Sequence, residues 1–174
     1  IGDSFTNCGN TGVRAFLNNR LFENIGNNQF SEVQNTDIET DFTDTEAAYW
    51  VDYDGDNDLD LINLNVCSVK AFQNNENTLS LVSLDLPSVS GLRSMEWADY
   101  NHDGLIDMLA VGTGSVFKNV GNGSFEAITL DEVEFPYSGK WFDADNDGDQ
   151  DILIAYRNNE IALFTNSEGN FSKS

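Results

Sequence analysis

The sequence has few of the residues on which many functional sites depend. Its 174 residues include one histidine, His102, and two cysteines, Cys8 and Cys67, so a zinc site has almost no ligands to draw on. The cysteines would form one disulfide or remain two buried thiols. No apolar run approaches the ~18 residues that a membrane helix needs, and we expect no membrane insertion.

Basic residues are also scarce. Eight Lys and Arg stand against 30 Asp and Glu, which gives a formal net charge of −22. Nucleic acids and anionic membrane surfaces need basic residues to neutralise their phosphates, so the charge argues against both as partners. A single histidine and the lack of a glycine-rich phosphate loop with a lysine give catalysis little support, and we expect no enzyme.

The three tryptophans of the chain mark an internal repeat. Trp50, Trp97 and Trp141 each lie shortly before a nine-residue run that is rich in Asp. The runs start at residues 52, 99 and 143, so that successive starts are 47 and 44 residues apart, and an apolar stretch follows each run. A period of ~45 residues is typical of propeller blades.

A Phe-x-Asn motif confirms this period and adds a fourth copy. It begins at Phe22, Phe72, Phe117 and Phe164, and each time a turn and a second apolar residue follow. An apolar strand, an Asn/Gly turn and another apolar strand are typical of a β-hairpin. We therefore expect one domain over residues 1–174, with repeats at about 1–36, 45–84, 92–130 and 138–174.

Strand positions follow from the same markers. Copy four predicts strands at about 140–142, 152–155 and 161–166, and from about 171 onward. Copy one predicts strands at about 13–17, 20–24 and 29–33. The acidic loop of copy one has lost its alternating acids, so we predict no metal site there.

The three acidic runs indicate metal sites. Side chains at positions 1, 3 and 5 of a tight loop converge on one point, and their oxygens are the ligands that Ca²⁺ prefers. Position 6 needs a residue that tolerates positive φ, and Asn57, Gly104 and Gly148 occupy it. Each run has Asp at position 9, whereas position 12 lacks the Glu of an EF-hand. The runs therefore predict strand–loop–strand calcium sites.

The pattern D-x-D/N-x-D-G-x-x-D, with its leading aromatic residue and the Phe-x-Asn hairpin, resembles the FG-GAP/VCBS repeats of integrin α-subunit propellers. This resemblance implies four-stranded blades that carry about three Ca²⁺ ions. The implied ligands are the side chains at positions 1, 3, 5 and 9 and the backbone carbonyl at position 7. They are Asp52, Asp54, Asp56, Asp58, Asp60, Asp99, Asn101, Asp103, Leu105, Asp107, Asp143, Asp145, Asp147, Asp149 and Asp151.

The expected fold is all-β, a β-propeller of about four four-stranded blades. Propellers have ~4–8 blades, so four copies make a complete small ring, a part of a larger ring, or a part of a propeller shared between chains. The start at Ile1 and the decayed first loop favour a fragment or an assembling subunit. An open sheet edge would invite pairing with another chain.

The resemblance implies a non-enzymatic, calcium-stabilised binding or adhesion module that is secreted or lies at the cell surface. Its partner would be a protein or glycan ligand, or further copies of the chain. Two alternatives stay open, a structural subunit of an extracellular assembly and a calcium-dependent, lectin-like carbohydrate binder. The aromatic residues that would either stack on sugars or pack in the core are Tyr53, Tyr100, Tyr137 and Tyr156. Glycosylation sequons begin at Asn122 and Asn170.

Overall fold

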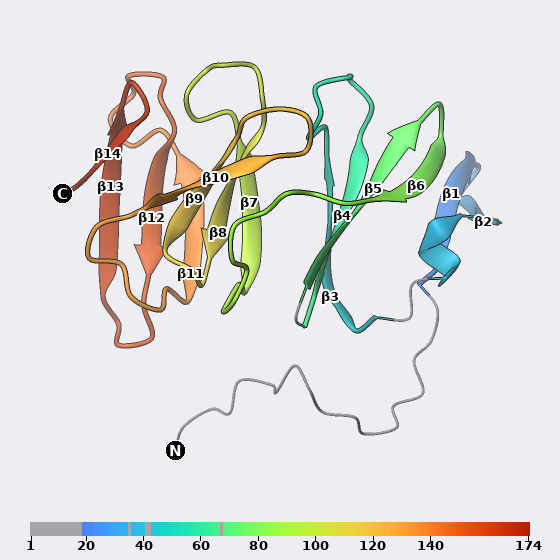
Figure 1. The fold of residues 1–174 in the computed structure, drawn as a ribbon, viewed down its shortest axis with the longest axis horizontal. Helices are drawn as coiled ribbons and strands as arrows, with labels where there is room; N and C mark the ends of the chain where they lie inside the picture. The colour runs from blue at the N-terminus through green and yellow to red at the C-terminus, as the bar shows by residue number, and fades with distance from the viewer. Residues whose placement is uncertain (1–18, 35, 41–42, 67) are drawn as a thin grey trace. The chain divides into compact units, whose positions relative to one another are not determined.

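The chain forms an all-β structure, as predicted (Figure 1). The structure is a computed structural model that describes residues 19–34, 36–40, 43–66 and 68–174. Within these ranges the helical structure consists of the short 3₁₀ turn η1 (Asp37–Thr40). No helix of this part of the chain has the length and apolar character that a membrane span requires.

Three of the sheets have four antiparallel strands that lie side by side in chain order. The first contains β3 (Thr45–Val51), β4 (Asp60–Asn65), β5 (Ser68–Asn75) and β6 (Thr78–Val82). The second contains β7 (Ser94–Ala98), β8 (Asp107–Val111), β9 (Ser115–Asn119) and β10 (Phe125–Thr129). The third contains β11 (Ser138–Phe142), β12 (Asp151–Ala155), β13 (Ile161–Ser167) and β14 (Asn170–Lys173). Each sheet corresponds to one predicted blade.

The first copy forms a smaller sheet among the described residues. It consists of the hairpin β1 (Leu21–Gly26) and β2 (Gln29–Val33), close to the strands predicted for this copy. Over residues 19–34 this sheet has two strands, whereas each of the other three sheets has four. The predicted strand at 13–17 lies outside the described residues, as do Cys8 and Cys67.

Contacts divide the molecule into two compact units, which are described separately. The first consists of the described residues within Ile1–Trp50, together with Asp60–Ser83. The second consists of Val51–Leu59 and Leu84–Ser174. The second unit thus holds two complete sheets and the loop that follows β3. The prediction of a single domain stays a prediction.

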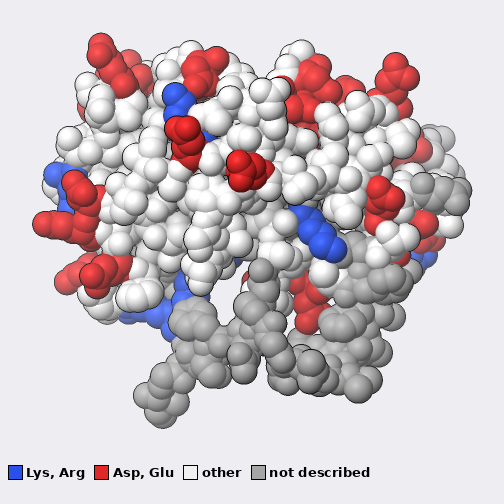
Figure 2. Space-filling model, viewed as in Figure 1, with Lys and Arg blue, Asp and Glu red and all other residues white. Residues whose placement is uncertain are grey.

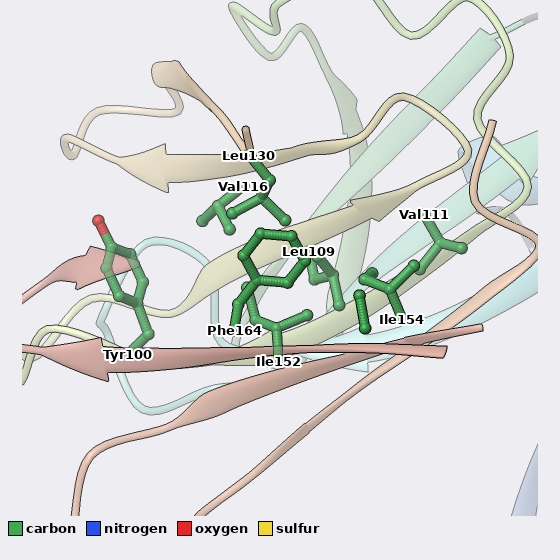
Figure 3. Packing of buried hydrophobic residues seen from close by; sticks show 9 residues of the cluster. Tyr100, Leu109, Val111, Val116, Leu130, Ile152, Ile154 and Phe164 are labelled. Carbon is green, nitrogen blue, oxygen red and sulfur yellow. The ribbon is translucent and has the colours of Figure 1, made fainter. Parts of the chain in front are cut away.

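The second strand of each four-stranded sheet is the most deeply buried one. All residues of β4 and β8 are buried, including the polar ones, because both faces of these strands are covered. In the second unit, Leu109, Val111 and Val116 of the β7–β10 sheet belong to one core cluster with residues of the β11–β14 sheet. Figure 3 shows these side chains directed toward Ile152, Ile154 and Phe164. The two sheets therefore pack face to face, as neighbouring blades do.

The core of the first unit repeats this packing. Phe72, which begins a Phe-x-Asn motif, is fully buried with Leu61 and Leu79 of the same sheet. Leu21 of the β1–β2 hairpin packs against this cluster. The hairpin therefore contacts the next sheet through its Leu21 side.

Candidate metal centres

The three acidic runs connect the first and second strands of the four-stranded sheets, where they were predicted. Each run turns sharply because two of its residues adopt positive φ. At position 6, φ is 73° at Asn57, 86° at Gly104 and 97° at Gly148, which confirms the backbone prediction for this position. Position 4 also has positive φ, and it is occupied by Gly55, His102 and Asn146. Gly, Asn and His are among the residues that tolerate this conformation best.

The Asp at position 1 holds the turn together in each loop. One of its carboxylate oxygens accepts a hydrogen bond from the backbone N–H at position 6. The N···O distances are 3.0 Å from Asn57 to Asp52, 3.0 Å from Gly104 to Asp99, and 3.1 Å from Gly148 to Asp143. The loops are therefore ordered by the same acids that are predicted to bind the metal.

Positions 3 and 5 form two overlapping Asx turns in each loop. The side-chain oxygen at position 3 accepts a hydrogen bond from the N–H at position 5, at 3.0–3.3 Å. The oxygen at position 5 accepts one from the N–H at position 7, at 2.8–3.0 Å. Asn101 makes the position-3 bond through its amide oxygen, just as Asp54 and Asp145 do with a carboxylate. An amide oxygen thus takes the place of a carboxylate oxygen in the middle loop.

Two of the loops bring three carboxylates close together. One carboxylate oxygen from each of Asp52, Asp54 and Asp60 lies within 4.8 Å of the others. Asp143, Asp145 and Asp151 form an equivalent group. These hard oxygen donors suit a divalent cation such as Ca²⁺. Among the described residues the Asp99 loop gives no such group of three acids, and its position 3 is Asn101.

The Asp at position 9 is fully buried in each loop, namely Asp60, Asp107 and Asp151. Each accepts a hydrogen bond of 2.7–2.8 Å from the backbone N–H of the Asn in the following Phe-x-Asn motif. Asp107 and Asp151 also accept from the N–H at position 2, at 3.3 and 2.7 Å. Position 9 therefore joins the metal loop to the hairpin of the same sheet.

The buried carboxyl of Asp107 is electrostatically unusual. Burial raises its pKa to about 7, and the charges of Asp103 and Asp99 act in the same direction. The N–H groups of Asn119 and Tyr100 oppose this rise without cancelling it. No Lys or Arg of the described chain forms an ion pair with Asp107. A bound cation would stabilise its charged form at neutral pH.

The Asn of the Phe-x-Asn motif has a role that the sequence did not reveal. The amide of Asn119 donates to the backbone carbonyl of Tyr53 at 2.7 Å and to that of Ile106 at 3.1 Å. Asn166 donates in the same way to Tyr100 at 2.9 Å and to Gln150 at 3.2 Å. Each buried Asn thus links position 8 of its own loop to position 2 of the preceding loop. The recurrence of Asn after Phe was the visible signal, but its partner lies 66 residues away.

The four aromatic candidates for sugar stacking occupy different environments. Tyr53 and Tyr100 are 4% and 2% exposed, and Tyr100 stacks on Trp141 with ring centroids 5.8 Å apart. Stacking on a sugar is therefore wrong for these two residues, because both rings are already covered by protein. Tyr156 is partly buried against the core of the second unit. Tyr137 is 54% exposed and remains accessible.

The remaining predicted features lie at the surface. The two sequon residues are both exposed, Asn122 in the turn between β9 and β10 and Asn170 at the start of β14. At position 7, the side chain of Asp149 accepts a hydrogen bond from the N–H of Glu168 at 3.3 Å.

Figure 2 shows Asp and Glu atoms spread over the face in view, with Lys and Arg atoms in fewer places. This distribution agrees with the negative net charge.

Comparison with known proteins agrees with the repeat pattern. The sequence model of the FG-GAP-like repeat matches residues 8–63 and 99–153, which together make up more than half of the chain. A search of curated proteins finds no significant match. The matched segments contain all three acidic loops, at 52–60, 99–107 and 143–151. The chain therefore belongs to the FG-GAP-like repeat family.

Proposed function

We propose that this chain is a calcium-stabilised, non-enzymatic binding module that works outside the cell. The acidic loops bind Ca²⁺ and fix the strands, and the surface of the sheets and their connections contacts the partner. Three lines of support are the geometry of the loops, the chemistry of their donors and the membership in a repeat family found in extracellular adhesion modules. The extracellular setting suits weak calcium sites, whose Kd is typically ~10⁻⁴–10⁻³ M.

The donor set fits calcium better than other common metals. Carboxylate, amide and backbone carbonyl oxygens are hard ligands, whereas zinc and copper sites draw on His and Cys. Ca²⁺ accepts six to eight oxygens in flexible geometry, while Mg²⁺ demands a near-ideal octahedron. In each loop the side chains at positions 1, 3, 5 and 9, with the carbonyl of Asp58, Leu105 or Asp149 at position 7, would hold the ion. When bound, the ion would offset the repulsion between the acids.

The observation that carries this proposal is the fully buried acid at position 9 of each loop. Burying a carboxylate costs several kcal/mol unless a positive charge compensates it. Asp107 and Asp151 receive only backbone N–H groups from the described chain. A divalent cation beside them supplies the missing positive charge. A surface that was acidic only for solubility would have no reason to bury these groups.

Thermal unfolding with calcium and with EDTA tests the proposal. At ten times Kd, each site adds about 1.4 kcal/mol, so three sites add roughly 4 kcal/mol. For a chain of this length that corresponds to a rise in Tm of roughly 10 °C. An equal Tm in calcium and EDTA would contradict the proposal.

The first loop provides a matched pair of variants for this experiment. Asp56 at position 5 and Asp58 at position 7 are both exposed, and they carry the same charge. Asp56→Ala removes a side-chain ligand and should lose about one third of the calcium-induced rise. Asp58→Ala leaves the position-7 carbonyl in place and should keep nearly all of it. Equal losses in the two variants would mean that the acids act only through their charge.

Binding of a carbohydrate is a second candidate function, and Tyr137 favours it. Its exposed ring lies 5.0 Å from the guanidinium carbon of Arg157 and 5.9 Å from that of Arg93. An exposed aromatic side chain is the kind of group that can pack against the apolar face of a sugar ring. Glycan-array binding by the wild type that is lost in Tyr137→Ala would support this function. A blank array would leave a protein partner as the ligand.

A further inference from the structure

The middle acidic loop, residues 99–107, differs from the other two in the charge of its donors. Its side chains at positions 1, 3, 5 and 9 carry three carboxylates, because position 3 is Asn101. The corresponding side chains of the 52–60 and 143–151 loops carry four carboxylates each. The number of charged ligands is one of the properties that set the affinity of a calcium site. The middle loop therefore has the weakest donor set of the three.

A lysine beside the middle loop adds a second difference. Lys118 is the central residue of the Phe-x-Asn motif on β9, and its ammonium nitrogen lies 3.5 Å from Oδ2 of Asp103 at position 5. The two side chains are 36% and 34% exposed, so neither is buried in the core. In the motifs that follow the other two loops, the equivalent residues are Gln73 and Thr165, which carry no charge. A cation of the protein itself thus lies beside a predicted calcium ligand of the middle loop.

The carboxylate of Asp103 has further partners inside its own loop. The amide nitrogen of Asn101 donates to the same oxygen, Oδ2, at 3.0 Å, and Oδ1 accepts from the backbone N–H of Leu105 at 3.0 Å. The equivalent Asp147 accepts through Oδ1 from the N–H of Asp149 at 2.9 Å. Among the described residues, Oδ2 of Asp147 has no hydrogen-bond or ion-pair partner. At position 5, the middle loop therefore has to give up protein contacts before this oxygen can bind a metal.

We propose that Lys118 competes with Ca²⁺ for the carboxylate of Asp103, so that the middle loop is the weakest of the three calcium sites. Without calcium, the ammonium group offsets part of the repulsion between the acids of this loop. When calcium binds, the ammonium has to leave Oδ2, because two cations beside one carboxylate oxygen repel each other. Calcium binding at the middle loop therefore includes the cost of breaking an ion pair, which the other two loops do not have at position 5.

The displaced lysine has a second acidic partner in the same sheet. Glu126 lies directly opposite Lys118 in the register of β9 and β10, a position from which side chains of neighbouring strands contact each other. The ammonium group can therefore move from Asp103 to Glu126 when calcium binds. This inference rests on the proposed calcium binding and adds an order to it. The middle loop fills last as the calcium concentration rises and empties first as it falls.

Isothermal titration calorimetry of the full chain with Ca²⁺ tests the proposal. The wild type should have two tighter sites and one site that is about tenfold weaker, because the missing carboxylate and the ammonium act together. Lys118→Met removes the charge but keeps a long side chain, so it should tighten the weak site by about threefold, the effect of an exposed ion pair. Lys140→Met is the matched control, since Lys140 pairs with Glu96 outside the loops, and it should leave all three affinities nearly unchanged.

Two substitutions within the loop identify the weak site. Asn101→Asp supplies the missing carboxylate and should tighten this site, whereas Asp103→Ala should abolish it and keep the two tighter ones. Three equal sites in the wild type, an unchanged weak site in Lys118→Met, or the loss of a tight site in Asp103→Ala would overturn the proposal. Each of these results would leave the calcium-dependent rise in Tm in place. A wild type that binds no calcium would overturn the proposed function together with this inference.

Discussion

Replacing Asn166 with alanine tests how the repeats are joined. The amide of Asn166 donates to the carbonyls of Tyr100 and Gln150 at 2.9 and 3.2 Å. Its oxygen accepts from the N–H of Gly169 at 2.9 Å. The side chain is 2% exposed, so water does not replace these bonds when it is removed. Asn166→Ala therefore leaves buried polar groups without their partners.

The size of the effect follows from these three hydrogen bonds. Each contributes about 1 kcal/mol net, and a buried group left unpaired costs ~1–3 kcal/mol. We expect Asn166→Ala to lower the free energy of unfolding by about 3 kcal/mol. This is a large part of the ~5–15 kcal/mol that holds a typical domain together. Asn166→Asp keeps the bond from Gly169 but turns two donors into acceptors, so it should cost at least as much.

Urea unfolding in saturating calcium measures these losses. Asn158→Ala is the matched control, because Asn158 makes its hydrogen bonds to Glu160 at the exposed surface. It should change stability by less than about 0.5 kcal/mol. If Asn166→Ala lowered the free energy of unfolding no more than Asn158→Ala does, the hydrogen bonds between successive loops would not stabilise the fold.

Two further predictions concern the metal loops and their backbone. Without metal, burial raises the pKa of Asp107 from its ordinary value of 3.8 to about 7. Between about pH 4 and pH 7 the Asp107 carboxyl therefore holds a proton in the folded state and has lost it in the unfolded state. Stability in EDTA should therefore rise as the pH falls through this window, and the rise in Tm between pH 8 and 5.5 should be smaller for Asp107→Asn; equal rises would refute the assignment. Gly148 has φ of 97° and open space around an added Cβ, so Gly148→Ala should cost ~1–2 kcal/mol from backbone strain alone. A differential-scanning measurement that showed no loss would mean that the loop can relax.

The sequence predicted the strands and the loop positions well, because both leave a local trace. The residues at position 6 were read correctly from their tolerance of positive φ. Strand β12 was predicted from its apolar run after Asp151 and differs from the prediction by one residue. These features depend on neighbours in the sequence, which is why single-chain patterns reveal them.

The features that the sequence did not predict depend on contacts between copies. Tyr100 carries the aromatic ring that a sugar site needs, but Trp141 and Phe171 of the next copy cover it. Phe22 has the same motif as the buried Phe117, yet it is exposed. An apolar residue in register shows that a face is suited to packing, but it does not show what packs there.

Native mass spectrometry counts the calcium ions that the three acidic loops are proposed to bind. The wild type should bind three Ca²⁺ ions at millimolar calcium. Asp56→Ala and Asp147→Ala, which each remove the position-5 ligand of one loop, should bind two, and Asp58→Ala should still bind three. A wild type that binds no specific calcium, or variants that bind as many ions as the wild type, would contradict the claim.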